Sequence, residues 1–510
     1  MDYLAIHAAS TPDSLALAGG GRSLTWLEFR RARDALTTAL VGLGLTPGDR
    51  VAIWAQNSVD FLLAGAGIAG VGATSVPVNH RLTAGEAAYV IDDCDAVAVV
   101  VDQAFLPLAE EIRLARRRVS TWIVVGQAPS WARPFADLVA DRPAEPGSQP
   151  SVEVVGSGGQ MVYTAGTTGV PKGATRTSVD RASVLAWMGA LDLAEPGHVH
   201  LVAGPLCHSA PFAFASLTLF MGGAVVVMSR FEPREALDLI ERHGVTSTFM
   251  APTLLQRLLS LSQAEREAHD LSSLRVLSVA AAPCPMRLKE ELVAWLGPVL
   301  YEFYGSTELG VNAVLRPEDV LRKPGSCGKA VAGTELAVFD EDGRHLAAGE
   351  PGGLFVRRNK GMFDGYHGLA EDQGLDVRGD WVSVGDIAYL DDEGFVYICD
   401  RKRDMVISGG VNIYSAEVED ALHRHPGIAD VAVFGVPDDH WGESVHAAVQ
   451  PRPGTSLDPE EVISFARLHL AGYKVPREVS LHAALPRDDA GKLLKRLLRE
   501  PYWSGRATRV

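Results

Sequence analysis

The first two thirds of the chain alternate between short apolar runs and longer segments whose apolar positions recur with a helical period. The apolar runs are Arg50–Trp54, Ala96–Val101 and Gly223–Met228. The helix-length segments are Leu27–Leu43, Pro233–Gly244 and Met286–Leu296. Uninterrupted apolar runs of about four to eight residues are typical of strands that are buried on both faces. Their alternation with helices predicts a layered α/β architecture.

The pattern changes at about residue 333, where strands and tight turns replace the helix-length segments. Thr334–Phe339 and Gly353–Arg357 are strand-like, and a D-D-E-G turn divides Ala388–Ile398 into two further strands. This texture predicts a β-rich subdomain. The C-terminal part then mixes the predicted helices Glu417–His425 and Pro459–Leu470 with the predicted strands Asp430–Val436 and Val445–Gln450. We expect a small α+β unit there.

One uncharged segment, Phe61–Val78, is about long enough to span a bilayer. It is dominated by Gly and Ala and interrupted by Pro77, so it is better interpreted as a packed helix followed by a buried strand. Its glycines at 65, 67 and 70 match the G-x-G-x-x-G pattern of dinucleotide sites. They fall inside the predicted helix and not at a strand-to-helix turn, which indicates close helix packing.

Composition narrows the partners and the compartment. The 510 residues include 47 Lys and Arg against 63 Asp and Glu, a net charge of −16, so we expect no nucleic-acid partner and no stable membrane insertion. The five cysteines are widely spaced and form no C-x-x-C pair, which indicates neither a disulfide framework nor a zinc site. The N-terminus lacks the basic and apolar pattern of a signal peptide, so the expected localisation is cytoplasmic.

The densest cluster of phosphate-binding residue types is the run Y-T-A-G-T-T-G-V-P-K-G at Tyr163–Gly173. Its glycines free the backbone to present successive N–H groups to phosphate oxygens, its threonines add hydroxyl donors, and Lys172 adds a cation. No Ser or Thr follows the lysine, so the run is not a P-loop. The candidate phosphate-binding residues are Thr164, Ala165, Gly166, Thr167, Thr168, Gly169 and Lys172.

This run resembles the signature loop of the adenylate-forming superfamily, which includes acyl-CoA synthetases, luciferases and the adenylation domains of peptide synthetases. Further segments similar to that superfamily's motifs follow in its order, from the region of Thr25 to Lys492. The resemblance implies a large N-terminal domain of layered α/β subdomains plus the β-rich subdomain, and a small mobile α+β C-terminal domain. It also implies ATP, Mg²⁺ and coenzyme A as cofactors.

Two segments, Ala280–Pro283 and Tyr301–Glu308, resemble those that enclose adenine and the α-phosphate. In that reading Tyr304 offers a flat face to the purine, Thr307 a hydroxyl to the phosphate, and Glu308 an oxygen ligand to Mg²⁺. The resemblance implies further nucleotide contacts from Ala281, Ala282, Pro283, Glu302, Phe303, Gly305, Ser306 and Ile398. It also implies that Asp386 and Arg401 recognise the ribose hydroxyls.

The segment P-L-C-H, which ends at His208, resembles the superfamily's segment beside the substrate carboxylate. Positioning, gating and direct catalysis are the alternative roles of this histidine. The implied walls of the acid pocket are His208, Ala210, Phe212, Ala280, Gly305 and Val311. None of them is a Lys or Arg that could pair with a second carboxylate, so we expect a hydrophobic monocarboxylic acid. Fatty, aryl and bulky terpenoid or steroid-type acids remain alternatives.

The segment R-K-R-D at 401–404 resembles the superfamily's hinge, with Arg403 at a pivot position that usually holds Asp or Lys. It implies domains 1–402 and 403–510. In the second domain, the implied contacts to the pantetheine arm and the nucleotide are Ser408, Gly409, Gly410, Tyr473 and Lys492. Lys492 resembles the adenylation lysine, which bridges the substrate carboxylate and the α-phosphate. Asp488 stands where Thr is common, and it either raises the pKa of Lys492 or competes for it.

The implied reaction begins with attack of a carboxylate on the α-phosphate of ATP, which expels pyrophosphate and leaves an acyl-adenylate. A thiol then attacks this mixed anhydride and releases AMP. The lysine is needed for the first step and stands in the way of the second, which gives a physical reason for a hinge. We therefore predict an AMP-forming acid–thiol ligase, an acyl-CoA synthetase, with Lys492, Thr307 and His208 as catalytic residues.

Three alternatives stay open. A separate acyl carrier protein could replace free CoA as the acceptor. A catalytically silent nucleotide-binding homologue would account for the departures at Ala165, Arg403 and Asp488. A homodimer is an open alternative to a monomer. An amino-acid substrate is disfavoured because no Asp follows His208 to hold an α-amino group, and a hydrolase is disfavoured because no G-x-S-x-G elbow is present.

Overall fold

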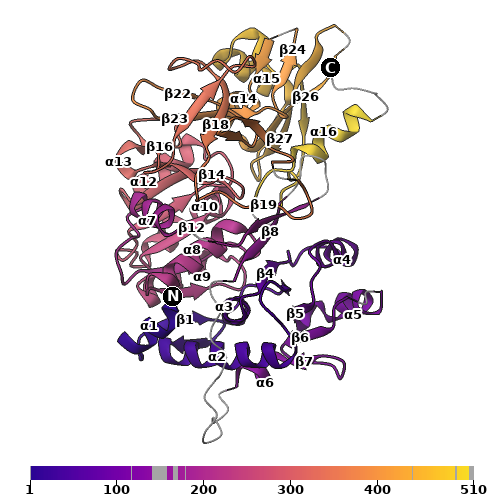
Figure 1. Ribbon diagram of the computed structural model, residues 1–510. Helices are drawn as coiled ribbons and strands as arrows, with labels where there is room; N and C mark the ends of the chain where they lie inside the picture. The colour runs from indigo at the N-terminus through magenta and orange to yellow at the C-terminus, as the bar shows by residue number, and fades with distance from the viewer. Residues whose placement is uncertain are drawn as a thin grey trace, which may run out of the picture.

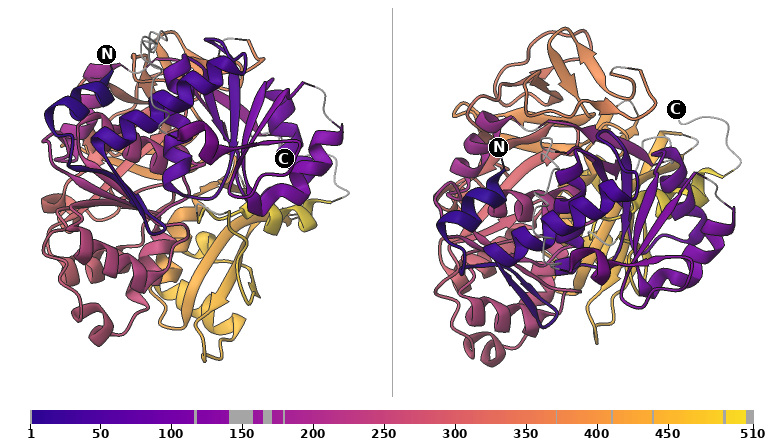
Figure 2. Two further views of the ribbon diagram at one scale, coloured as in Figure 1. Left: turned by 90° about the horizontal axis from the view of Figure 1, so that it is seen from below. Right: turned by 60° about the horizontal axis from the view of Figure 1, so that its bottom comes forward.

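The computed structural model describes residues 2–115, 118–140, 158–164, 171–178, 180–370, 372–409, 411–438, 440–488 and 491–504. Two large sheets with helices packed on them form the first part of the chain, a smaller sheet follows, and a fourth lies in the C-terminal part (Figure 1). In both views of Figure 2 the part coloured indigo to purple lies beside the part coloured magenta. The predicted α/β architecture is confirmed.

The first sheet is mainly parallel and includes the predicted strand Arg50–Trp54 at its centre. Its order is β19 (Gly365–Tyr366), β9 (Lys172–Arg176), β8 (Gln160–Thr164), β4 (Thr74–Pro77), β3 (Arg50–Trp54), β5 (Ala98–Asp102), β6 (Thr121–Val125) and β7 (Arg133–Pro134). The edge strand β19 comes from far along the chain and pairs antiparallel with β9.

The second sheet is also mainly parallel and ends in an antiparallel hairpin on each side. Its order is β16 (Lys329–Ala330), β15 (Gly310–Leu315), β14 (Leu300–Ser306), β13 (Val276–Val279), β12 (Ser247–Met250), β10 (Val199–Val202), β11 (Ala224–Val227), β1 (Leu15–Gly19) and β2 (Arg22–Thr25). The helices of the N-terminal part are α1 (Tyr3–Ser10), α2 (Trp26–Gly42), α3 (Val59–Val71), α4 (Ala84–Asp93), α5 (Leu106–Ala115), α6 (Phe135–Val139), α7 (Arg181–Ala190), α8 (Ser209–Phe220), α9 (Pro233–His243), α10 (Pro252–Leu259), α11 (Gln263–Glu267), α12 (Met286–Leu296) and α13 (Pro317–Val320).

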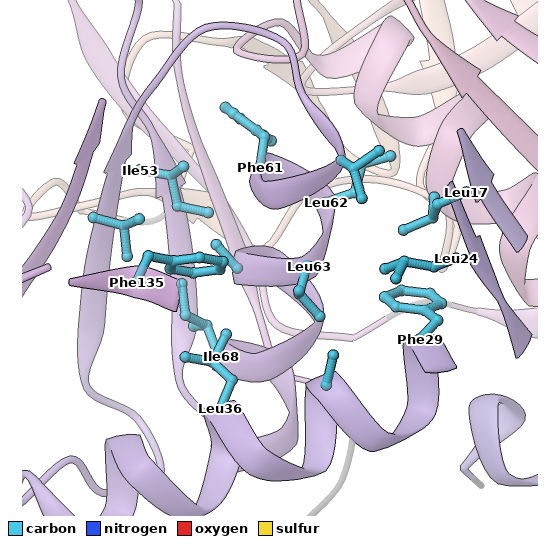
Figure 3. Packing of buried hydrophobic residues seen from close by; sticks show 14 of the residues in the cluster. Leu17, Leu24, Phe29, Leu36, Ile53, Phe61, Leu62, Leu63, Ile68 and Phe135 are labelled. Carbon is cyan, nitrogen blue, oxygen red and sulfur yellow. The ribbon is translucent and has the colours of Figure 1, made fainter. Parts of the chain in front are cut away.

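A shared hydrophobic core joins the two sheets through α2 and α3 (Figure 3). Gly67 and Gly70 lie inside α3, and a Cβ on either would come within 2.4 Å of Leu36 or 2.3 Å of Thr37 on α2. The glycine pattern therefore serves close helix packing, as predicted. The segment Phe61–Val78 forms most of α3 and then β4, which confirms a packed helix followed by a buried strand. Among the described residues, no helix is long and apolar enough to cross a membrane.

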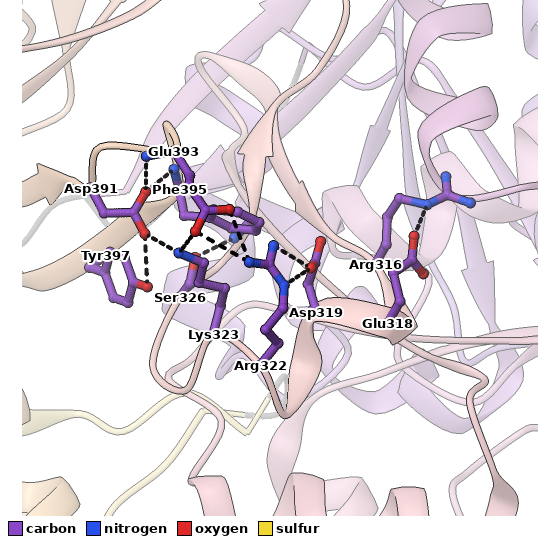
Figure 4. Close-up of polar contacts among 11 residues, drawn as sticks. Arg316, Glu318, Asp319, Arg322, Lys323, Ser326, Asp391, Glu393, Phe395 and Tyr397 are labelled. Atoms are coloured by element: carbon purple, nitrogen blue, oxygen red, sulfur yellow. Dashed lines mark hydrogen bonds and ion pairs between the residues drawn. The ribbon is translucent and has the colours of Figure 1, made fainter.

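The β-rich subdomain is the third sheet, and its D-D-E-G hairpin is clamped by charges (Figure 4). Its strands are β17 (Leu336–Phe339), β18 (Gly352–Arg357), β20 (Asp376–Arg378), β21 (Trp381–Ser383), β22 (Asp386–Leu390) and β23 (Val396–Arg401). Lys323 donates to Asp391 at 2.7 Å and to Glu393 at 2.6 Å, while Asp391 accepts from the backbone N–H of Phe395 at 2.9 Å. The clamp fixes β22 and β23.

The C-terminal part contains a fourth sheet with helices packed against it. Its strands are β24 (Val406–Ser408), β25 (Val411–Ile413), β26 (Ile428–Asp438), β27 (Gly442–Pro451) and β28 (Glu478–Leu481), and its helices are α14 (Ser415–His423), α15 (Pro459–His469) and α16 (Lys495–Trp503). The two helices and two strands predicted here are all present within three residues of their expected ends. The domain boundary at Arg403 stays a prediction.

Candidate functional site

The phosphate-binding run is carried by the hairpin of β8 and β9. Thr164 is the last residue of β8 and pairs with Lys172, the first of β9, so the strands fix both ends of the connecting loop. The residues between them that the sequence singled out, Ala165, Gly166, Thr167, Thr168 and Gly169, lie outside the described residues. The described ends of the loop stand beside the second candidate segment.

Glu308 connects the two segments. Its Oε1 accepts a hydrogen bond from the hydroxyl of Tyr366 at 2.7 Å and a longer one from the hydroxyl of Thr164 at 3.5 Å. The carboxylate is buried, yet no donor among the described residues reaches its Oε2. A hard carboxylate oxygen beside a phosphate-binding loop fits Mg²⁺, which is usually held by one or two carboxylates together with substrate phosphates. Glu308 would hold the ion, and the ion would neutralise phosphate charge.

Thr307 stands beside the start of α8. Its hydroxyl lies 3.0 Å from that of Ser209, and its carbonyl accepts from the Arg176 guanidinium at 3.3 Å. His208 immediately precedes α8 and is half-buried. Thr307, implied to bind phosphate, and His208, implied to lie beside the substrate carboxylate, are therefore both found at the start of α8.

Tyr304, Asp386 and Arg401 form one connected group. The Tyr304 hydroxyl donates to Asp386 at 2.6 Å, and Arg401 approaches the other oxygen of Asp386 at 3.3 Å. Asp386 and Arg401 also pair directly across β22 and β23. Burial, and then the charge of Asp386, raise the pKa of Tyr304 well above its usual value, so its hydroxyl stays protonated and donates. Ile398 packs in the same hydrophobic cluster as Tyr304.

Several residues that the resemblance implies as nucleotide contacts have side chains engaged in other interactions. Glu302 forms a buried ion pair with Lys289 of α12, and Phe303 packs in an aromatic cluster with Phe214 and Phe249. The Ser306 hydroxyl accepts from the backbone N–H of Leu309. Ala281 and Pro283 are exposed, Ala282 is half-buried, and Ala281 has a left-handed φ of 75°. The structure does not bring the side chains of Glu302 and Phe303 to the candidate site.

The residues implied to line the acid pocket pack in two different hydrophobic clusters. Ala210, Ala280 and Val311 pack in the aromatic cluster of Phe214, whereas Phe212 packs on the core of α2 and α3. Gly305 is exposed.

The loop that carries Lys492 folds back on itself and touches α10. The Asp488 carboxylate accepts from the Lys492 N–H at 2.8 Å, and the Asp488 N–H donates to the Lys492 carbonyl at 2.9 Å. Gly491 has a φ of 83°, and a Cβ there would lie 2.0 Å from the hydroxyl of Thr253. Only glycine fits that conformation and that approach.

The Lys492 ammonium lies within electrostatic reach of the ribose-binding candidates. Burial, and then the charges of Arg401 and Arg403, lower its pKa to about 8, although Asp488 and Asp386 act in the opposite direction. Asp488 acts to raise the pKa of Lys492, but burial outweighs it. The charges of Asp386 and Arg401 therefore act on the Lys492 ammonium.

The remaining C-terminal candidates have other neighbours among the described residues. Gly409 packs against the ring of Trp441, and Tyr473 is 55% exposed. Ser408 is half-buried on β24, and Gly410 lies outside the described residues. Among the residues that the structure describes, no hydrogen bond or ion pair joins Ser408, Gly409 or Tyr473 to Lys492.

Sequence reasoning missed three residues of this site: Tyr366, Arg176 and Ser209. Tyr366 is distant in sequence from Glu308, and a lone tyrosine in a turn-rich segment carries no pattern signal. Arg176 follows the phosphate-binding run as the half-buried last residue of β9, and a single arginine after the run carries no pattern signal either. It donates to the carbonyls of Gly361 and Met362 and so ties β9 to the segment before Tyr366.

Comparison with known proteins identifies the family. The family model described as "AMP-binding enzyme" matches residues 4–367, and that described as "AMP-binding enzyme C-terminal domain" matches residues 417–492. The chain belongs to the AMP-binding enzyme family. The resemblance to the adenylate-forming superfamily is thereby confirmed, as are the AMP-forming acid–thiol ligase class and ATP, Mg²⁺ and CoA as cofactors.

Two curated relatives and one solved structure match this AMP-binding enzyme over nearly its whole length. The fatty acid–[acyl-carrier-protein] ligase ScoC of Streptomyces coeruleorubidus is 32% identical over 99% of this chain and 96% of its own. The feruloyl-CoA synthase of Amycolatopsis sp. is 33% identical over 97% of both chains. The crystal structure of ATP-bound MatB from Rhodopseudomonas palustris has a TM-score of 0.87, 28% identity and 99% coverage of both chains. The cytoplasmic localisation and the homodimer stay predictions.

Proposed function

We propose that this AMP-binding enzyme is an acyl-CoA synthetase that converts a hydrophobic monocarboxylic acid to its acyl-adenylate and then to its CoA thioester. In the first step a carboxylate oxygen bonds to the α-phosphorus of ATP as the bond to pyrophosphate breaks. In the second step the CoA thiolate bonds to the acyl carbon and AMP leaves. The observation that carries the proposal is the connected group of Tyr304, Asp386 and Arg401, because the charges of Asp386 and Arg401 also act on the Lys492 ammonium.

The proposed roles follow from the contacts. Asp386, oriented by Tyr304 and Arg401, accepts hydrogen bonds from the ribose hydroxyls. Thr307, held beside Ser209, donates to the α-phosphate, and His208 stands on the side of the substrate carboxylate. Lys492 contributes a positive charge where negative charge develops during adenylate formation. Thr164, Lys172 and the loop between them bind the other phosphates.

The orientation of the C-terminal part supports a two-conformation cycle. In the present arrangement the charges of Asp386 and Arg401 act on Lys492, which suits adenylate formation, while Gly409 packs against Trp441 and Tyr473 is 55% exposed. We propose that residues 403–510 rotate about Arg403 to bring the loop of Ser408, Gly409 and Gly410 to the adenylate for thioester formation.

The acceptor and the acid are tested in one experiment. The similarity to the feruloyl-CoA synthase supports free CoA as acceptor, and the similarity to ScoC supports an acyl carrier protein as the second candidate. Purified protein is incubated with ATP, Mg²⁺ and a panel of fatty, aryl, bicyclic and polycyclic acids, with CoA, with a phosphopantetheinylated carrier protein, or with neither. Products are read by mass spectrometry.

We expect acyl-adenylate without acceptor and acyl-CoA with CoA. If the adenylate persists with CoA but is consumed by the carrier protein, the acceptor is the carrier protein and not free CoA. No adenylate from any acid would overturn the proposal in favour of a silent nucleotide-binding protein. A Lys492→Ala preparation made in parallel controls for contaminating synthetases.

A further inference from the structure

We propose that Tyr366 is the positioning residue of the metal and phosphate site, because its hydroxyl orients Glu308 and its ring holds Lys172. The inference rests on the proposed function only in taking Glu308 as the Mg²⁺ ligand. It concerns the short strand β19, which joins the first sheet and which no motif of the sequence marked.

The hydroxyl acts on one oxygen of Glu308 and leaves the other open. Tyr366 donates to Oε1 at 2.7 Å, whereas no donor among the described residues reaches Oε2. A hydrogen bond to a charged acceptor is short and directional, so it fixes the rotation of the carboxylate. Glu308 is thereby held with one oxygen bound to Tyr366 and, among the described residues, one oxygen that no donor occupies and that a cation would bind. Burial, and then the charge of Glu308, raise the pKa of Tyr366, which keeps the hydroxyl protonated.

The ring acts on Lys172. The Lys172 ammonium lies 5.2 Å from the centroid of the Tyr366 ring, within the range of a cation–π contact. Phe363 packs against the same ring at 5.0 Å in an edge-on arrangement and limits its rotation. One aromatic side chain therefore sets the cation of the phosphate-binding run relative to the carboxylate of the metal site.

The backbone of Tyr366 is fixed from two sides. It pairs with Ala174 in the β19–β9 ladder, and the N–H of the next residue, His367, donates to the Gly173 carbonyl at 2.8 Å. On the other side, the N–H of Phe363 donates to the Glu308 carbonyl at 2.8 Å. The tyrosine thus belongs to a rigid bridge between the strand of Lys172 and the segment of Glu308.

The test separates positioning from a general structural role by measuring ATP binding with and without metal. Isothermal titration calorimetry gives the affinity for ATP in excess Mg²⁺ and in EDTA, without acid or CoA. We expect Tyr366→Phe to weaken Mg²⁺–ATP binding about tenfold, the effect of losing one hydrogen bond to a charged group, with little change in EDTA. Tyr366→Leu also weakens binding in EDTA, because Lys172 loses its ring. Equal losses in both buffers for Tyr366→Phe, or no loss, would overturn the proposal.

Two controls keep the result interpretable. Tyr397→Phe deletes a comparable tyrosine–carboxylate hydrogen bond, to Asp391 at 3.3 Å, on the distant hairpin, and should leave both affinities unchanged. Glu308→Gln should reproduce the metal-selective loss, and adding Tyr366→Phe to it should cost nothing further, since both act on one interaction. Additive losses would contradict the inference. Because no acid is present, failure of the adenylation panel would leave this result readable.

Discussion

The hydroxyl of Tyr304 donates to Asp386 across 2.6 Å and so joins β14 of the second sheet to β22 of the third. A buried tyrosine thereby orients a carboxylate that lies on a different sheet. Arg401 reaches the other oxygen of the same carboxylate at 3.3 Å. The ribose-binding candidate is thus held from both sides before any nucleotide arrives.

Tyr304→Phe removes this orienting bond and keeps the ring. We expect the KM for ATP in adenylate formation to rise about tenfold, because one hydrogen bond to a charged acceptor is lost, while kcat changes less. Pyrophosphate exchange kinetics measure both constants. Tyr389→Phe, on the same strand as Asp386 but outside the site, should leave the KM unchanged. An unchanged KM in Tyr304→Phe would contradict the role given to the pair.

Lys492→Ala should separate the two half-reactions. Adenylate formation should fall by at least about a hundredfold, since a cation at the developing charge is lost, whereas thioester formation from supplied acyl-adenylate and CoA should continue. Each half-reaction is followed by mass spectrometry. Loss of both would mean that the lysine supports the fold and not the first step, and circular dichroism would then show the change.

The pH dependence of adenylation should report Lys492. Its pKa is lowered to about 8, so the cation is present below that pH and is lost as the pH rises through it. The kcat/KM for ATP should therefore fall above about pH 8, because this parameter reports groups of the free enzyme. Thioester formation from supplied adenylate should not share this fall.

Removing a positive charge near Lys492 should shift the pH at which kcat/KM decreases. Arg403 is one of the cations that lower the pKa of Lys492, so Arg403→Ala should shift the fall of kcat/KM to higher pH. Arg424→Ala, which deletes an exposed arginine paired with Asp420 on α14, should not shift it. A profile of Arg403→Ala that coincides with that of the native enzyme would contradict the effect of Arg403 on Lys492.

We expect the buried ion pair of Lys289 and Glu302 to matter for the free energy of unfolding. Lys289→Ala leaves a buried carboxylate without its partner and should lower the free energy of unfolding by about 3–5 kcal/mol, measured by urea denaturation. Replacing both residues, as Lys289→Met with Glu302→Leu, should recover most of that loss. Arg496→Ala breaks an exposed pair with Glu500 and should cost less than about 1 kcal/mol. A stable Lys289→Ala variant would show that the pair is solvated.

The local part of this site could be predicted from sequence, and the part made by distant contacts could not. The phosphate-binding run and the helix of Gly67 and Gly70 follow from short-range spacing, which sets turn and packing geometry directly. On the strand of Tyr304, side chains alternate between faces, so Glu302 and Phe303 could not be assigned to a side without knowing which layers cover the sheet. The contact of Tyr366 with Glu308 depends on β19 joining the first sheet, which no local pattern encodes.

The pairing of β19 with β9 affects the chain while it is being synthesised. A strand edge that lacks its partner presents unpaired N–H and C=O groups to any other strand it meets. During synthesis β9 leaves the ribosome early, but β19 follows only after the whole second sheet has been translated. The nascent chain therefore carries an open edge at the strand of Lys172 from the completion of β9 at Arg176 until β19 begins at Gly365, and it is this interval in which aggregation or chaperone capture would act.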